Sequence, residues 1–296
     1  MTTIGFIGLG IMGSPMAANL VAAGFDVVGC NRSPAKVDAL VAKGGRGAAS
    51  VGDAVKEADI VITMLPDSPD VLAVVLSDDG VLANSRPGQL LIDMSTIRPE
   101  ASREVAAAAA GVGLATLDAP VSGGESGAIE GSLSIMVGGD AADVETAQPV
   151  LQAMGSTIVH VGPHGAGQTV KAANQLMVAG HLQLLAEALV FLEASGVDQE
   201  AAVRVLGGGL AGSTVLARKS ANMLTGDFTP GFRLALHHKD LGIVTQAARE
   251  AGVVIPLGAV VAQLVASLVA RGDGQLDHSA LLKLTAELSS PSRADG

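Results

Sequence analysis

The sequence contains no tryptophan and no tyrosine, and phenylalanine occurs only five times in 296 residues. Proteins that stack single-stranded nucleic acid on aromatic side chains have a different composition. Acidic residues outnumber basic ones, 29 against 18, which gives a formal net charge of −11. A chain this acidic repels a polyphosphate backbone, so we do not expect nucleic acid as a partner.

Cysteine is nearly absent as well, since Cys30 is the single one. One cysteine excludes an intrachain disulfide and fits a cytoplasmic protein. The first ten residues, "MTTIGFIGLG", have no basic segment, so we expect no signal peptide. The most apolar late stretch, residues 254–270, is interrupted by Pro256 and Gln263 and is short for a membrane span. We therefore expect a buried helix there and no membrane partner.

Short apolar runs alternate with helical patterns in the first half of the chain. The runs cover residues 3–7, 26–30, 58–65, 88–95, 113–120, 132–139 and 156–162. The helical patterns cover residues 14–24, 33–45, 50–57, 68–76 and 99–110. This alternation predicts βαβ units around a parallel sheet, that is, an α/β Rossmann-type doubly wound domain.

After about residue 162 the sequence predicts helices and no further strands. Residues 166–195 read as one long amphipathic helix, which at about 1.5 Å per residue would span roughly 45 Å. Shorter helices are predicted at residues 198–206, 213–224, 237–251, 257–270 and 278–288. We therefore expect two domains, a dinucleotide-binding domain over residues 1–163 and an all-helical domain over residues 164–296. The tail, residues 289–296, is expected to be frayed.

A glycine-rich turn links the first predicted strand to the first helix. It consists of Gly8, Leu9, Gly10, Ile11, Met12 and Gly13, and it matches G-x-G-x-x-G. Between a strand and a helix this spacing permits a tight turn, close approach of a pyrophosphate and close helix packing, with the anion at the helix N-terminus. We expect a dinucleotide site, with a methyltransferase-type nucleotide site as the main alternative.

The residues after the second strand select between the two nicotinamide cofactors. An NAD enzyme usually has an acidic residue there, which binds the ribose 2′-hydroxyl. This chain has Asn31, Arg32 and Ser33 instead. Arg32 could pair with a 2′-phosphate, or it could be an ordinary surface charge. We expect NADP, with NAD as the alternative.

Two further segments carry polar groups that could bind and convert a substrate. "DAPVSGG", residues 118–124, ends in Ser122, Gly123 and Gly124, which could bind a carboxylate or form a simple glycine turn. In "GAGQTVKAANQ", spacings of three and four residues put Lys171, Asn174 and Gln175 on one helical face. A solvated face is the alternative interpretation of that lysine.

At this point the sequence resembles the β-hydroxyacid dehydrogenases over nearly its whole length. The resemblance is carried by "GFIGLGIMGSPMAANL", "DMSTIRP", "DAPVSGG", "GAGQTVKAANQ" and "GDFTPGFRLALHHKDL". Residues 208–216 and 277–281 look most like family members that reduce tartronate semialdehyde. One departure is Gln175, where many members have a second asparagine.

The resemblance implies a role for each matching residue. Lys171 would be the catalytic lysine, Asn174 would orient the substrate, and Ser122, Gly123 and Gly124 would hold its carboxylate. Ser213 is expected to bind a substrate hydroxyl. The cofactor would be held by the glycine turn, by Asn31, Arg32 and Ser33, and by Met64, Leu65, Pro66, Thr96 and Lys239, with Lys239 also closing the substrate cleft.

The implied reaction is reduction of 2-hydroxy-3-oxopropanoate to glycerate by hydride transfer, with Lys171 as general acid or base. Oxidation of 3-hydroxyisobutyrate or a related 3-hydroxy acid is the alternative, and a dinucleotide-sensing module without catalysis is a rival of another class. The six histidines show no metal-ligand spacing, and we expect surface or capping roles for them. The apolar face of the long helix predicts a homodimer or homotetramer.

Overall fold

The computed structural model describes residues 1–289, so the predicted frayed tail lies outside the described residues from position 290 onward. The chain forms two compact units, Met1–Lys171 and Ala172–Gly296. Helix α9 (Ala166–Ala194) begins in the first unit and continues into the second. The sequence placed the boundary earlier, after residue 163, in the turn that precedes this helix.

The first unit is built on one mixed sheet with the strand order β3-β2-β1-β4-β5-β6-β8-β7, and β9 pairs with β8. Its strands are β1 (Thr3–Ile7), β2 (Asp26–Cys30), β3 (Arg46–Gly47), β4 (Ile60–Thr63), β5 (Leu90–Asp93), β6 (Ala115–Asp118), β7 (Val121–Ser122), β8 (Leu133–Gly139) and β9 (Gly155–Gly162). All pairs from β3 to β6 are parallel. This confirms the α/β Rossmann-type class.

The sheet is not parallel throughout, which the sequence did not indicate. Strand β8 runs antiparallel to both β6 and β7, while β9 is parallel to β8. The chain reverses through Gly123, Gly124 and Gly131, whose φ angles of 144°, 67° and 65° favour glycine. Strands β3 and β7 have only two residues each, too few to leave a periodic pattern, and were not predicted.

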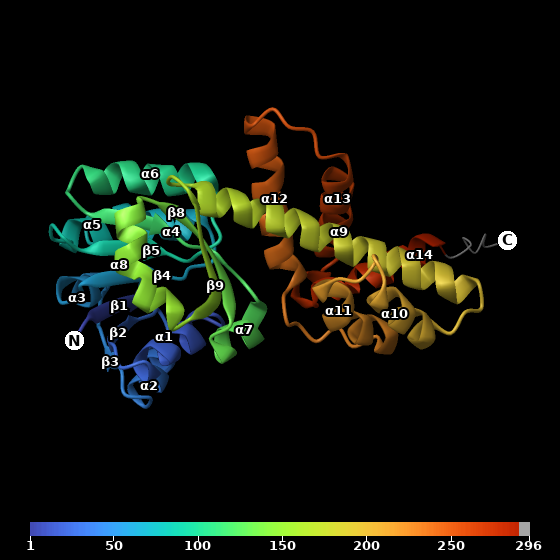
Figure 1. The fold of residues 1–296 in the computed structure, drawn as a ribbon, viewed down its shortest axis with the longest axis horizontal. Coiled ribbons are helices and arrows are strands. Elements are labelled where there is room, and N and C mark those ends of the chain that lie inside the picture. The colour runs from blue at the N-terminus through green and yellow to red at the C-terminus, as the bar shows by residue number, and fades with distance from the viewer. Residues whose placement is uncertain (290–296) are drawn as a thin grey trace. The chain divides into compact units, whose positions relative to one another are not determined.

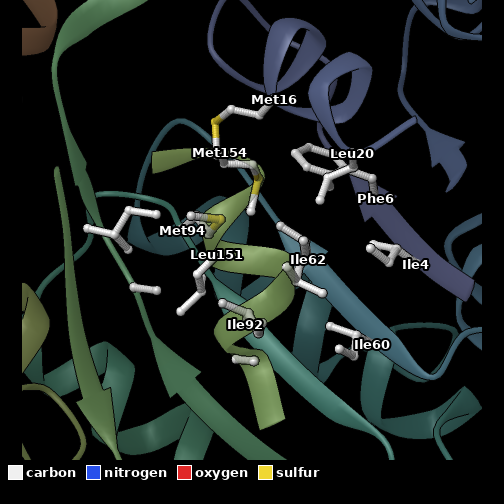
Figure 2. Close-up of a cluster of buried hydrophobic side chains, with 14 of the residues drawn as sticks. Ile4, Phe6, Met16, Leu20, Ile60, Ile62, Ile92, Met94, Leu151 and Met154 are labelled. Carbon is white, nitrogen blue, oxygen red and sulfur yellow. The ribbon is translucent and has the colours of Figure 1, made fainter. Parts of the chain in front are cut away.

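Helices pack on both faces of this sheet (Figure 1). They are α1 (Gly13–Ala22), α2 (Pro34–Val41), α3 (Val51–Lys56), α4 (Ser68–Leu76), α5 (Val81–Asn84), α6 (Pro99–Ala110), α7 (Gly124–Glu130) and α8 (Ala141–Gln152). Figure 2 shows one core, in which Met16 and Leu20 of α1 and Leu151 of α8 pack with Phe6 and Ile92 of the sheet. Helices α3, α4 and α6 contribute to the opposite core. The sequence analysis missed α5, α7 and α8.

The second unit is helical, as predicted. It contains the rest of α9, α10 (Gln199–Gly208), α11 (Thr214–Thr225), α12 (Leu234–Glu250), α13 (Pro256–Ala270), α14 (Leu281–Ser289) and the short 3-10 turns η1 (Asp273–Gln275) and η2 (His278–Ala280). Its described residues form one isolated β-bridge, between Arg233 and Asp277, and no longer strand. Its core joins Leu182 and Leu189 of α9 to Leu241 of α12 and Val265 of α13.

A buried polar cluster ties the start of α12 to η2. Asp277 is fully buried, and its carboxylate lies 2.8 Å from the Lys219 ammonium. The prediction of surface or capping histidines is wrong for His237 and His278, which are buried with their Nδ1 atoms 3.2 Å apart. Burial, followed by the neighbouring His237, lowers the pKa of His278 well below its usual 6.5, which favours the neutral ring.

Helix α9 is long and apolar enough to cross a membrane, with a mean hydropathy of 1.5 in its most apolar window. Its polar side chains argue for another role. Gln168, Lys171, Gln175 and Gln183 are all buried, and each has a hydrogen bond to another protein group. Such partners are typical of a core helix in a folded protein.

Candidate functional site

The glycine turn lies where β1 leads into α1, at the carboxyl ends of the parallel strands. A Cβ atom on Gly8 would lie 2.3 Å from the carbonyl oxygen of Met64, and one on Gly13 would lie 1.9 Å from that of Gly8. These two glycines are therefore required by the fold itself. A Cβ on Gly10 would meet nothing within 4 Å. Gly10 thus leaves the outer side of the turn open, as the approach of a pyrophosphate requires.

The segment after β2 braces this turn from the side. The Gly8 N–H donates to the Cys30 carbonyl at 3.0 Å, and the Leu9 N–H donates to Asn31 Oδ1 at 3.1 Å. The Asn31 amide also donates to the Ser33 carbonyl at 3.4 Å. The Asn31 side chain therefore holds backbone, while Arg32 and Ser33 are exposed at the end of the strand.

A buried hydrogen-bond network joins the loops after β4 and β5. The Met64 N–H donates to the Ile7 carbonyl at 2.9 Å, and the Leu65 N–H donates to Ser95 Oγ at 2.8 Å. This places Met64–Pro66 beside the glycine turn and beside the segment that contains Thr96. The sequence-predicted residues of these loops are thus brought together in the first unit.

Asp93, at the end of β5, is the titratable group at the centre of this network. Its Oδ1 accepts hydrogen bonds from Thr63 Oγ1 at 2.7 Å and from the Ser95 N–H at 3.2 Å. Burial raises the pKa of Asp93 to about 6, against the opposing effect of the bonds from Ser95 and Thr63, and the charge of Asp118 raises it further. Asp93, Asp118 and His164 are among the residues that line a small cavity of about 10 Å³.

Lys171 lies in the second turn of α9 and reaches the segment predicted to bind a carboxylate. Its side chain is 7% exposed, and Nζ donates to the Val121 carbonyl at 2.6 Å. Val121 directly precedes Ser122. Gly123 and Gly124 follow with positive φ, and a Cβ on Gly124 would meet nothing within 4 Å. A buried amine therefore lies beside a half-buried glycine turn, and the solvated-face interpretation of Lys171 does not apply.

In the second unit, a chain of polar contacts runs from α9 to α12. Asn174 Nδ2 donates to Gln175 Oε1 at 2.7 Å, and Gln175 Nε2 donates to Asp240 Oδ2 at 2.5 Å. The other Asp240 oxygen lies 2.9 Å from Lys239 Nζ. Because a carboxylate only accepts hydrogen bonds, the NH₂ group of Gln175 must be the end that points to Asp240. The Gln175 oxygen is then the end that accepts from the NH₂ group of Asn174. Gln175, the departure from the usual second asparagine, thus links Asn174 to α12.

Ser213 has a local partner, because its hydroxyl accepts the Leu216 N–H at 3.0 Å and caps the start of α11. The sequence analysis named neither Asp240 nor Gln168, which hydrogen-bonds to the residues on both sides of Thr96. Asp240 follows Lys239 in the motif "GDFTPGFRLALHHKDL", so the sequence could have identified Asp240 as a candidate site residue. Gln168 also lies in a motif quoted above, "GAGQTVKAANQ", but the sequence does not indicate its partners, which lie about 70 residues earlier in the chain.

The described residues contain no group of three or more His, Cys, Asp or Glu side chains that could hold a metal ion. The open side of the glycine turn and the exposed end of β2 instead suit a dinucleotide. These features fit a nicotinamide cofactor at the carboxyl ends of the strands, where open α/β sheets bind their ligands.

Comparison with known proteins agrees with this geometry. Residues 3–162 match the family described as the NAD binding domain of 6-phosphogluconate dehydrogenase. Residues 165–285 match the family described as NAD-binding of NADP-dependent 3-hydroxyisobutyrate dehydrogenase.

Curated relatives and solved structures match across almost the entire chain. The 2-hydroxy-3-oxopropionate reductase of Escherichia coli is 40% identical, over 95% of this chain and 96% of the relative. The 3-hydroxyisobutyrate dehydrogenase of Pseudomonas aeruginosa is 41% identical, over 96% and 98%. The structure of Mycobacterium tuberculosis 3-hydroxyisobutyrate dehydrogenase with L-serine gives a TM-score of 0.89 at 39% identity, covering 98% and 100%. The chain therefore belongs to the β-hydroxyacid dehydrogenase family and is an NAD(P)-dependent oxidoreductase.

Proposed function

We propose that this enzyme reduces 2-hydroxy-3-oxopropanoate to glycerate, with Lys171 as the proton donor. The observation that carries the proposal is the buried Lys171 amine, 2.6 Å from the Val121 carbonyl and next in sequence to the Ser122–Gly124 turn. Reduction of an aldehyde leaves negative charge on its oxygen, and a positioned amine can transfer a proton to that oxygen.

Each group of site residues has a separate role in the proposed reaction. A bound nicotinamide supplies the hydride. Ser122, Gly123 and Gly124 bind the substrate carboxylate through a hydroxyl and backbone N–H groups. Asn174, three residues after Lys171 on α9, orients the substrate, and Lys239 binds the substrate or the cofactor.

A small substrate fits the sequence of the loop between α10 and α11. Residues 209–213, between the two helices, are two glycines, leucine, alanine and serine. Such a loop leaves room for the 2-hydroxyl of 2-hydroxy-3-oxopropanoate. Sequence identity does not separate the substrates, because an L-serine dehydrogenase of Pseudomonas aeruginosa is also 41% identical over 96% of this chain.

For the cofactor we propose a preference for NADP. The end of β2 has no carboxylate to repel a 2′-phosphate, and the Arg32 guanidinium is exposed there. Asn31 supports this assignment indirectly, because its side chain holds the glycine turn and leaves Arg32 and Ser33 to contact the ribose phosphate.

One substrate panel tests both parts of this proposal. We expect the highest kcat/KM with 2-hydroxy-3-oxopropanoate and NADPH, measured by absorbance of the reduced nicotinamide. Glyceraldehyde, which lacks the carboxylate, is the control and should react poorly. Faster oxidation of 3-hydroxyisobutyrate or L-serine than of glycerate would contradict the substrate assignment. Equal or better use of NADH would contradict the cofactor assignment.

The role of Lys171 is tested by replacing it with methionine. Lys171→Met keeps most of the side-chain length without the amine, and general acid–base catalysis contributes about 10²- to 10⁴-fold. We expect kcat to fall by at least about 10²-fold, while the fold and NADPH binding persist. A kcat within about threefold of the parent would show that the proton comes from another group.

We also propose that the exposed face of α9 pairs with a second copy of the chain, in a protein of the cytoplasm. Met177, Leu184 and Phe191 recur at seven-residue intervals and are 61%, 52% and 70% exposed. Met177 and Leu184 also line a groove of about 360 Å³, which α9 forms with the start of α13. An exposed apolar groove next to Phe191 on the same helix suits the self-complementary contact of a two-fold dimer.

Light scattering after size exclusion tests this pairing. We expect a dimer or a tetramer for the parent chain and a smaller species for Leu184→Glu, which puts a charge in the groove. Val205→Glu is the matched control, because Val205 is a 76% exposed apolar residue on α10, away from the groove lining. A monomeric parent at micromolar concentration would disprove the proposal.

A further inference from the structure

Gln168 is a fully buried glutamine in the first turn of α9, one turn before Lys171. The oxygen and the NH₂ group of its side-chain amide both form hydrogen bonds to one backbone segment. The Ile97 N–H donates to Oε1 at 3.1 Å, and Nε2 donates to the Ser95 carbonyl at 2.8 Å. These two bonds grip the backbone on either side of Thr96. A glutamine is well suited to this contact, because the site needs one donor and one acceptor at fixed positions.

The backbone N–H of Gln168 forms a further hydrogen bond, to a residue outside the Ser95–Ile97 segment. The Gln168 N–H donates to Asp118 Oδ2 at 3.0 Å, and the Gly165 N–H donates to Asp118 Oδ1 at 2.7 Å. Asp118 is 2% exposed, so both bonds form away from water. The Gln168 side chain therefore joins the start of α9 to the segment around Thr96.

The close approach of α9 to this network depends on two glycines. A Cβ on Gly167 would lie 2.4 Å from the Met136 carbonyl oxygen and 2.7 Å from the Asp118 carbonyl oxygen. A Cβ on Gly138 would lie 2.5 Å from Asp118 Oδ1. The helix start thus has no room to shift toward β8, and the Gln168 amide fixes it on the side of β5.

We propose that Gln168 is a positioning residue for the reaction: it clamps the Ser95–Ile97 backbone to α9 and so sets the spacing between Thr96 and the Lys171 amine. The inference rests on the proposed role of Lys171. A shift of about 1 Å in a reacting group can cost on the order of 10²-fold in rate, so such a clamp has a measurable effect without touching the substrate.

The first test replaces the amide and separates turnover from binding. For Gln168→Ala we expect kcat to fall by about 10- to 100-fold, with the NADPH Kd and the substrate KM within about threefold of the parent. NADPH fluorescence can report the Kd directly, since the chain has no tryptophan. Gln183→Ala is the matched control. Gln183 is a buried glutamine on the same helix, bonded to Glu187 and Thr285, and its loss should lower stability without changing kcat.

The second test uses Gln168→Glu and varies the pH. A protonated carboxyl can donate to the Ser95 carbonyl and accept from the Ile97 N–H, as the amide does. An ionised carboxylate would instead place an acceptor against the Ser95 carbonyl. Burial raises the pKa of the new carboxyl above the usual value of about 4.3. The ratio of variant kcat to parent kcat should therefore increase as the pH falls from about 8 to about 5.5. If the substitution only lowers stability, the kcat ratio of the protein that remains folded should not increase in this way.

Three outcomes would overturn the proposal: a Gln168→Ala kcat within about threefold of the parent, an equal loss in Gln183→Ala, or a Gln168→Glu ratio that stays flat or falls toward acid. If Gln168→Ala does not fold, the pH dependence of Gln168→Glu decides. Lys171→Met is measured in the same assay. Normal turnover in Lys171→Met would refute the proposed function, whereas normal turnover in Gln168→Ala alone would refute only the clamp.

Discussion

The first unit depends on one buried carboxylate, that of Asp118, at the N-terminus of α9. Its two oxygens accept the Gly165 and Gln168 N–H groups, which a helix start leaves without intrahelical partners. A negative charge is favourable at that end of a helix, and the bonds are charge-assisted. Removing the carboxylate would leave buried donors unsatisfied, at a cost of about 1–3 kcal/mol each. The start of α9, and with it Lys171, is placed by this interaction.

The remaining parts of the site lie at the ends of the strands next to Asp118. Strands β1, β4, β5 and β6 are parallel neighbours, so the loops that follow them emerge at one edge of the sheet. There the Met64 N–H bonds to Ile7 at the end of β1, just before the glycine turn, and the Leu65 N–H bonds to Ser95, next to Thr96. Relatives with different named substrates are about equally similar to this chain, as expected where one fold carries several substrate specificities.

The features that could be predicted from the sequence are those encoded by residues close together in the chain. The glycine turn between β1 and α1, the long α9 and the helical second unit were all visible from local patterns. The predictions failed where packing overrides local preference. Helix α8 contains Pro149, and α7 has two glycines in seven residues, so neither looks helical alone. Gln168 was missed for another reason, since its partners at Ser95 and Ile97 are brought to it only by the fold.

The central claim is that an amine at position 171 carries the proton, and chemical rescue tests it most directly. Turnover of Lys171→Ala should be restored, at least in part, by small primary amines such as ethylamine, in proportion to their concentration. The parent enzyme should show no such response. If no small amine raises the turnover of the folded, NADPH-binding variant, the amine of Lys171 is not the group that transfers the proton.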